Sequence, residues 1–149
     1  MLADELRKTF AERYGGGGRV PVVRAPGRVN LIGEHTDYND GFVLPMAISR
    51  GVTIAGRARG DRKLRLFSLD YGEEAIADLG ERFGSQPARW SRYVEGVVRT
   101  FEEELDAELN GFDAVITGDV PQGAGLSSSA ALEVATGFFL NELYGLKVG

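Results

Sequence analysis

The alternation of β-branched segments with amphipathic helices constrains the fold of this 149-residue chain more than any other feature. The clearest helix is predicted over residues 90–109, where apolar residues recur at 3.6-residue spacing and form one stripe. A second helix is predicted to begin near Ser128 and to end at Gly145. A further helix at the start of the chain is indicated by the spaced apolar residues from Leu2 to Phe10.

The predicted strands are short apolar segments. One lies at residues 20–23, strands around a turn are predicted within 42–58, and further strands follow at 64–69, 75–79 and 112–117. Strands that precede helices and alternate with them indicate an α+β domain. A chain of 149 residues fits one such domain, so we expect residues 1–149 to form a single unit.

Composition excludes several classes of function. The chain has no Cys, which rules out disulfides and thiolate metal sites, and its one His, His35, excludes a histidine-cluster metal site. The formal net charge is −5 with no basic stripe, which argues against nucleic-acid binding. No apolar stretch is long enough to span a bilayer, and the N-terminus lacks the apolar region of a signal peptide. We therefore expect no membrane partner and a cytoplasmic location.

The segment GDVPQGAGLSSSAA, which begins at Gly118, joins a predicted strand to a predicted helix. The free N–H groups and positive dipole of a first helical turn can bind phosphate, and serine hydroxyls there can ligate Mg²⁺. The residues leave a second interpretation open, because Gly-rich turns join many strands to helices and Ser is a common N-cap. Ala124 stands where the Walker lysine would be, and Ser128 replaces the last glycine of the dinucleotide fingerprint.

Polar side chains crowd residues 24–41. Carboxylates, an imidazole and amides at fixed angles can recognise sugar hydroxyls, which both donate and accept hydrogen bonds. The same residue types are usual in a solvated, turn-rich loop, and composition alone favours that simpler interpretation. The cluster consists of Arg24, Arg28, Asn30, Glu34, His35, Asp37, Asn39 and Asp40.

Both segments resemble motifs of one kinase superfamily. Pro121 to Ala130 matches P-x-G-x-G-L-S-S-S-A, the phosphate motif of the GHMP kinases, at each fixed position. Gly27 to Tyr38 matches G-R-x-N-[IL]-I-G-E-H-x-D-Y, the sugar-binding signature of the galactokinases. The two motifs, in this order, make the chain similar to the N-terminal part of a galactokinase. The resemblance implies the α+β N-terminal domain of a GHMP kinase, a mixed sheet backed by helices.

The resemblance also implies how ATP and Mg²⁺ are bound. The backbone of the Gly/Ser turn would wrap the nucleotide phosphates, and the hydroxyl of Ser129 would ligate Mg²⁺. Glu133 is expected to be a solvated or structural residue, because the family's acidic metal ligand lies further downstream. Trp90 resembles a position near the adenine pocket, although its place in the apolar stripe predicts core packing. The residues implied for the ATP phosphates are Gly123, Ala124, Gly125, Leu126, Ser127, Ser128 and Ser129.

For the sugar, the resemblance implies transfer of the γ-phosphoryl group of ATP to the C1 hydroxyl of α-D-galactose. Arg28 would be the catalytic residue of this chain, because its charge beside the anomeric oxygen can stabilise the transferring group. The residues implied for galactose binding are Glu34, His35, Thr36 and Asp37.

The same resemblance implies parts that residues 1–149 do not contain. The catalytic Asp of the family's M-D-Q segment, the acidic Mg²⁺ ligand and the C-terminal domain have no counterpart in this sequence. We therefore expect a truncated portion, inactive alone, of an enzyme that is a monomer at full length. Two alternatives stay open: a non-catalytic galactose and ATP sensor, against which the intact Ser127–Ser129 run argues, and a kinase for N-acetylgalactosamine or arabinose.

Overall fold

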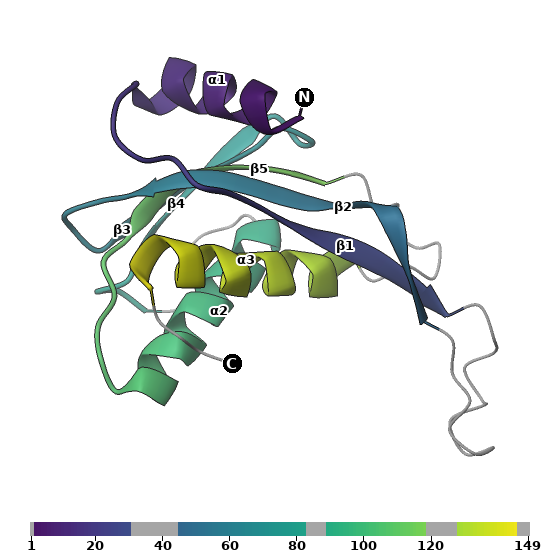
Figure 1. Ribbon diagram of the computed structural model, residues 1–149. Helices are drawn as coiled ribbons and strands as arrows, with labels where there is room; N and C mark the ends of the chain where they lie inside the picture. Colours follow the sequence, from purple (N-terminus) through teal and green to yellow (C-terminus); the bar gives the residue numbers. More distant parts are fainter. Residues whose placement is uncertain (1, 31–44, 83–88, 119–127, 146–149) are drawn as a thin grey trace.

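The computed structural model describes residues 2–30, 45–82, 89–118 and 128–145 (Figure 1). Within these ranges, no helix is both long and apolar enough to cross a lipid bilayer. The elements, in chain order, are α1 (Leu2–Tyr14), β1 (Val22–Asn30), β2 (Pro45–Ala58), β3 (Lys63–Ser68), β4 (Glu73–Asp78), α2 (Arg89–Leu105), β5 (Phe112–Gly118) and α3 (Ser128–Tyr144).

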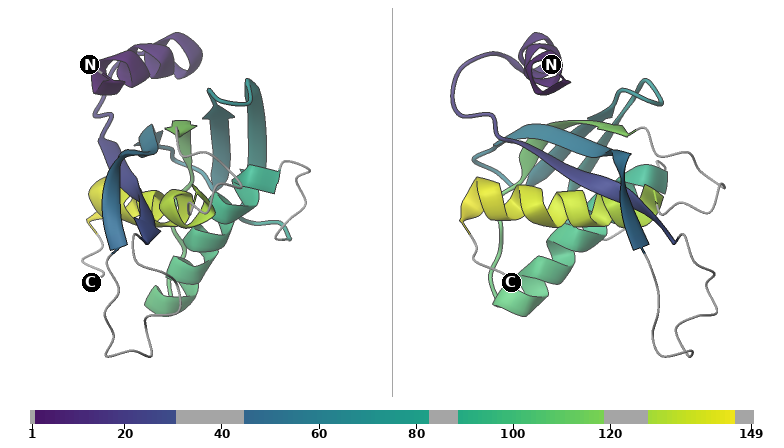
Figure 2. Two further views of the ribbon diagram at one scale, coloured as in Figure 1. Left: turned by 90° about the vertical axis from the view of Figure 1, so that its right-hand side faces the viewer. Right: turned by 45° about the vertical axis from the view of Figure 1, so that its right-hand side comes forward.

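The strands form one mixed sheet in the order β1-β2-β5-β3-β4. The central strand β5 is antiparallel to β2 and parallel to β3, and the outer pairs β1–β2 and β3–β4 are antiparallel. Helix α1 lies on one face of the sheet, whereas α2 and α3 lie together on the other (Figure 1, Figure 2). The expected mixed sheet backed by helices is confirmed.

The main core lies between the sheet and the α2–α3 layer. Phe112 of β5 packs edge-on against Phe139 of α3, with ring centroids 5.0 Å apart. Gly56 of β2 permits this approach, because a Cβ there would lie 2.6 Å from the Phe139 ring. Each large apolar side chain buried in this way contributes roughly 1.5–3 kcal/mol to stability. Further members of the core are Ile54, Leu64, Leu66, Val94, Val98, Ala114, Ala135 and Leu140.

The α1 face of the sheet combines a small apolar cluster with cationic side chains that lie over aromatic rings. The Arg13 guanidinium lies 3.5 Å from the centroid of the Phe67 ring, and that of Arg65 lies 4.8 Å from the centroid of Tyr14. These contacts join α1 to β3, so the helix is held by charge as well as by burial. The apolar cluster beneath it consists of Leu6, Phe10, Ala55 and Val115.

The prediction of strands around a turn within 42–58 is wrong for the part of this segment that the structure describes. Residues 45–58 form the single strand β2, which pairs with β1 along that strand's whole length, from Val22 to Asn30. Because β1 pairs with this segment both before and beyond Gly51, and β5 adds pairing on the other side from Val52 onward, the chain stays extended through Gly51. The strands predicted at 64–69, 75–79 and 112–117 are confirmed as β3, β4 and β5, with small shifts in their bounds.

Helix α2 ends earlier than the apolar spacing predicts. Asp106 adopts a φ of 50°, and the N–H groups of Asp106 and Ala107 donate to the carbonyls of Glu103 and Glu102, which is the Schellman pattern of a helix end. Leu109 still enters the core, with 8% of its surface exposed, because its N–H donates to the Glu102 carboxylate at 2.8 Å. Leu109, the last apolar residue of the predicted stripe, therefore lies in the loop after α2, and its side chain is nevertheless buried.

Asp113 of β5 binds two arginines on the α1 face. Arg59 Nη1 donates to its carboxylate at 2.9 Å, and Arg65 Nε and Nη2 donate at 2.8 and 2.9 Å. The Asp113 side chain is only 6% exposed. Burial raises the pKa of this carboxyl, but the hydrogen bonds from Arg65 and Arg59 outweigh burial and hold the pKa below its usual value.

Replacing Asp113 with Asn removes the charge that both arginines bind. We expect Asp113→Asn to lower the free energy of unfolding at pH 7 by about 2 kcal/mol, the usual size for hydrogen bonds to charged groups. Because the folded pKa of Asp113 is lowered, its contribution is complete above the unfolded pKa of about 3.9 and is lost as the pH falls through the folded pKa. Between about pH 5 and pH 2, the free energy of unfolding measured with urea should therefore fall more in the wild type than in the variant. An equal fall in both proteins would contradict this account.

Candidate functional site

The carboxyl end of β5 is the point from which the candidate site is built. β5 ends at Gly118, opposite Val52 of β2, and the neighbouring strand β3 ends with Ser68 opposite Ile116. Because β3 and β5 are parallel, the chain leaves both strands at the same edge of the sheet. The Gly/Ser turn that is predicted to bind phosphate begins at this edge.

The β1–β2 hairpin projects beyond this edge as a two-stranded arm (Figure 1). Its last pairs join Arg28 to Ala47 and Asn30 to Pro45, whereas the ladder between β2 and β5 stops at Val52. The backbone of Arg28, the predicted catalytic residue, therefore lies on the arm. The predicted galactose ligands Glu34, His35, Thr36 and Asp37 fall between the two strands of the arm in sequence and lie outside the described residues.

A register shift between Pro26 and Arg28 marks the base of the arm. Gly51 pairs with Pro26 here, and a Cβ at Gly51 would lie 2.3 Å from the carbonyl oxygen of Ala25. Only glycine permits this approach of the two backbones. Irregular pairing of this kind changes the direction of the strand beyond it. The shift therefore sets the direction of the backbone of β1 at Arg28.

Helix α3 begins on the same side of the molecule as the arm (Figure 1, Figure 2). The helix has 17 residues, and its first turn holds Ser128 and Ser129 with no acidic residue, so the positive end of its dipole is not neutralised within that turn. This is the electrostatic setting that favours an anion. The side chains of both serines lie outside what the structure describes, as do the other predicted phosphate ligands, Gly123, Ala124, Gly125, Leu126 and Ser127.

The predicted Mg²⁺ site rests on Ser129 alone. Among the residues that the structure describes, no group of three or more His, Cys, Asp or Glu side chains could hold a metal ion. Glu133, one turn further along α3, is exposed, as the sequence predicts. A hydroxyl ligand combined with phosphate oxygens suits Mg²⁺, which prefers oxygen and retains several waters. The assignment stays a prediction.

The sequence patterns do not identify Asp70, the second residue after the end of β3. One carboxylate oxygen of Asp70 accepts from Thr117 Oγ1 at 2.9 Å, and the other accepts from the Gly118 N–H at 2.7 Å. In the sequence, Asp70 stands before Tyr71 and Gly72 and is indistinguishable from an ordinary turn residue. Its partners are far away in the chain, so no local pattern could have found the contact.

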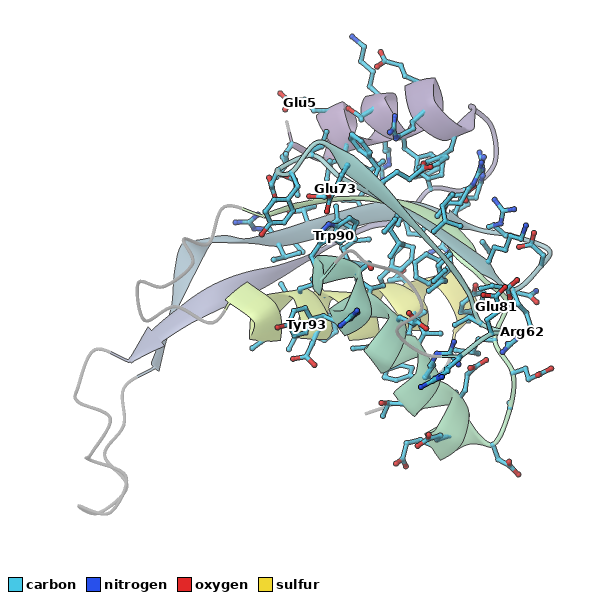
Figure 3. All side chains as sticks on the ribbon, turned by 180° about the vertical axis from the view of Figure 1, so that it is seen from behind. Glu5, Arg62, Glu73, Glu81, Trp90 and Tyr93 are labelled. Atoms are coloured by element: carbon cyan, nitrogen blue, oxygen red, sulfur yellow. The ribbon has the colours of Figure 1, made fainter. Side chains whose placement is uncertain are left out.

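Trp90 lies in the first turn of α2 and packs, partly buried, against the main core. The predicted core-packing role is therefore confirmed, while the predicted role near adenine stays untested. The indole Nε1 of Trp90 donates to the carboxylate of Glu73 at the start of β4 (Figure 3). The next carboxylate, Glu74, accepts from the hydroxyl of Tyr14 in α1, because successive strand residues face opposite sides of the sheet.

Two family models match this chain in the order of the two motifs. The model described as the galactokinase galactose-binding signature matches residues 8–58. The model described as the GHMP kinases N terminal domain matches residues 92–149. The first range contains the projecting arm and the second contains the Gly/Ser turn with α3.

Similar proteins agree with these matches. The galactokinases of Chloroflexus aggregans and Roseiflexus sp. (strain RS-1) are 50% and 48% identical over 136 and 144 residues, which is 90% and 97% of this chain. The chain spans 35% and 36% of their lengths. The crystal structure of Lactococcus lactis galactokinase complexed with galactose superimposes with a TM-score of 0.83 at 37% identity, covering 100% of this chain and 39% of that protein. Methanococcus jannaschii mevalonate kinase shares the fold, with a TM-score of 0.73 at 21% identity over 90% of this chain and 43% of that protein.

The contact between Glu73 and Trp90 is open to a direct test, because Trp90 is the only tryptophan of the chain. We expect Glu73→Ala to release the indole, which lowers the fluorescence anisotropy of Trp90 and raises its quenching by acrylamide. Glu74→Ala is the matched control, since it removes the neighbouring carboxylate on the α1 face. Equal anisotropy and quenching in the Glu73 variant and the wild type would contradict the account.

Proposed function

We propose that this chain, which belongs to the galactokinase family of the GHMP kinases, supplies the sugar site and the nucleotide-phosphate site of an ATP-dependent galactokinase. The observation that carries the proposal is the match of the galactose-binding signature over residues 8–58 followed by the GHMP model over residues 92–149. The likeness to a galactokinase that was crystallised with galactose supports the choice of sugar. Because the chain spans about a third of its relatives' length, the activity is that of a longer polypeptide.

The proposed reaction transfers the γ-phosphoryl group of ATP to the C1 hydroxyl of α-D-galactose. A bond forms between the sugar oxygen and the γ-phosphorus, the bond from that phosphorus to ADP breaks, and the hydroxyl proton passes to a base. By resemblance to the family the base is an Asp beyond residue 149, so we expect no turnover from residues 1–149 alone. Mg²⁺ bound to ATP would offset the negative charge of the phosphates during transfer.

On the sugar side, the proposal assigns recognition to Glu34, His35, Thr36 and Asp37. Carboxylates and an imidazole can accept from or donate to adjacent sugar hydroxyls, and the same groups discriminate between epimers because the hydroxyl directions differ. Arg28 would stabilise the negative charge of the group in transfer, for which a guanidinium that is always protonated is suited. The position of its backbone on the arm supports this role.

On the nucleotide side, the proposal assigns the ATP phosphates to the Gly/Ser turn and to the first turn of α3. A helix start without acidic residues favours the phosphate charge, and backbone N–H groups supply the hydrogen bonds. Ser129 would ligate Mg²⁺, and Trp90 would lie near the adenine. An ATP-using kinase of this family would act in the cytoplasm, where ATP is found, and the monomeric state expected of it is part of the same proposal.

Asp37 provides the sharpest test of the sugar assignment. The test uses the extended protein, meaning this chain continued to the length of the galactokinases. We expect Asp37→Ala to weaken galactose binding by about 10- to 100-fold, the loss expected for hydrogen bonds to a charged group, while ATP binding is kept. Calorimetric titration with each ligand measures both affinities.

Asp40→Ala is the matched control, because it removes the same charge beyond the Gly27–Tyr38 match. Galactose affinity unchanged by Asp37→Ala would refute the assignment of the sugar site. Galactose and ATP binding without phosphoryl transfer by the extended protein would instead favour the sensor alternative. Faster turnover of N-acetylgalactosamine or arabinose than of galactose would favour a kinase for a related sugar.

A further inference from the structure

We infer that Asp70 is a positioning residue for the binding of nucleotide phosphate. Its carboxylate fixes Thr117 and Gly118, the last two residues of β5, at the point where the Gly/Ser turn begins. The inference rests on the proposed function, because it gives Asp70 a task in the same nucleotide site. It adds a residue that lies outside both matched motifs and in a different part of the chain.

Both carboxylate oxygens of Asp70 accept hydrogen bonds from β5. Oδ1 accepts from the Thr117 hydroxyl at 2.9 Å, while Oδ2 accepts from the Gly118 N–H at 2.7 Å. Hydrogen bonds to an ionised carboxylate are shorter and roughly twice as strong as neutral ones. One side chain therefore holds both the backbone and the side chain of the strand end.

The contact replaces a strand partner that β5 lacks at its end. The ladder between β3 and β5 stops at Ser68 opposite Ile116, and the N–H of Leu69 makes the next bond, to the Ile116 carbonyl at 3.0 Å. Beyond this point the chain of β3 turns away, so the Gly118 N–H would have no partner on that side. The Asp70 carboxylate occupies the place that the next residue of a longer β3 would have filled.

Asp70 is itself held by a closed turn. The Gly72 N–H donates to the Ser68 carbonyl at 2.9 Å, the Tyr71 N–H donates to the Ser68 hydroxyl at 3.2 Å, and Gly72 adopts a φ of 63° that favours glycine. The turn also leads into Glu73, which binds Trp90 at the start of α2. The connection between β3 and β4, together with the first residue of β4, thus contacts the end of β5, from which the proposed phosphate turn departs, and the start of α2, where the proposal puts adenine.

The role follows from hydrogen bonding and not from charge. A carboxylate near a phosphate site repels the nucleotide, so Asp70 would weaken binding if its charge were its main effect. An Asn in its place has no charge but can keep both contacts, because its Oδ1 can accept from the Gly118 N–H while its Nδ2 donates to the Thr117 hydroxyl. Asn and Ala at position 70 therefore separate the two explanations.

The test measures the MgATP and galactose affinities of the extended protein by calorimetric titration, with the thermal unfolding midpoint of each variant. We expect Asp70→Ala to weaken MgATP binding about tenfold and Asp70→Asn to stay within about twofold of wild type, since hydrogen bonds to charged groups are lost in the first and replaced in the second. Galactose affinity should not change. Glu74→Ala, the matched truncation on the α1 face, should leave MgATP affinity unchanged.

Each outcome decides the inference. MgATP affinity at the wild-type level in folded Asp70→Ala overturns it, and so does equal weakening by Ala and Asn, because Asn can keep both hydrogen bonds. Tighter MgATP binding in both variants would show instead that the charge of Asp70 is its main effect. If Asp70→Ala does not fold, Thr117→Val removes one of the two donors without changing shape and should weaken MgATP binding about threefold, less than the loss of both bonds, because the bond from the Gly118 N–H remains. A folded wild-type extended protein that does not bind MgATP at all refutes the proposed nucleotide site instead, and the inference falls with it.

Discussion

The position of β5 between an antiparallel and a parallel neighbour is the constraint on which the rest of this structure depends. Pairing with β2 sets the register of the hairpin that forms the arm, and parallel pairing with β3 brings the carboxyl ends of β3 and β5 to the same edge of the sheet. Because β2 continues past the point where β5 stops, the arm has to project beyond the sheet, with the sugar signature at its tip in sequence. The same edge is where the Gly/Ser turn departs. A slip of one residue in the β5 ladder would turn its buried side chains to the wrong face and displace both segments together.

The two faces of the sheet are stabilised by different kinds of contact. The α2–α3 face is apolar, with Phe112 packed on Phe139, and it fixes the distance between the sheet and the helix whose first turn faces the site edge. The α1 face uses ionic and cation–π contacts around Asp113 and Arg65. These contacts lie near the opposite end of β5 from Gly118, so they stabilise the sheet without placing extra charge at the phosphate edge. The buried charge of Asp113 is therefore paired with arginines, away from the edge where the phosphate site is proposed.

Much of the fold could be predicted from residue spacing, and the candidate site from the resemblance of two motifs to those of one kinase superfamily. The stripe that contains Val94 and Val98 predicts a helix with one buried side, and both residues are in the core. The end of α2 could not be predicted, because Asp106 takes a left-handed conformation that Gly or Asn adopts more often. The contact from Asp70 to Gly118 depends on the parallel pairing of β3 with β5, and no local pattern in the sequence specifies that pairing.

The central claim is that sugar and nucleotide meet at the edge where β5 ends, and amide chemical-shift mapping of the isotope-labelled chain tests it most directly. Galactose should shift the amide signals of the arm near Arg28 and Asn30, and MgATP should shift those of Thr117 and Gly118 and of the first turn of α3. Amides at the other end of the sheet, such as Ala58 and Phe112, should stay unchanged. Shifts that gather around Ala58 and Phe112, or galactose and MgATP shifts at opposite ends of the sheet, would contradict the account.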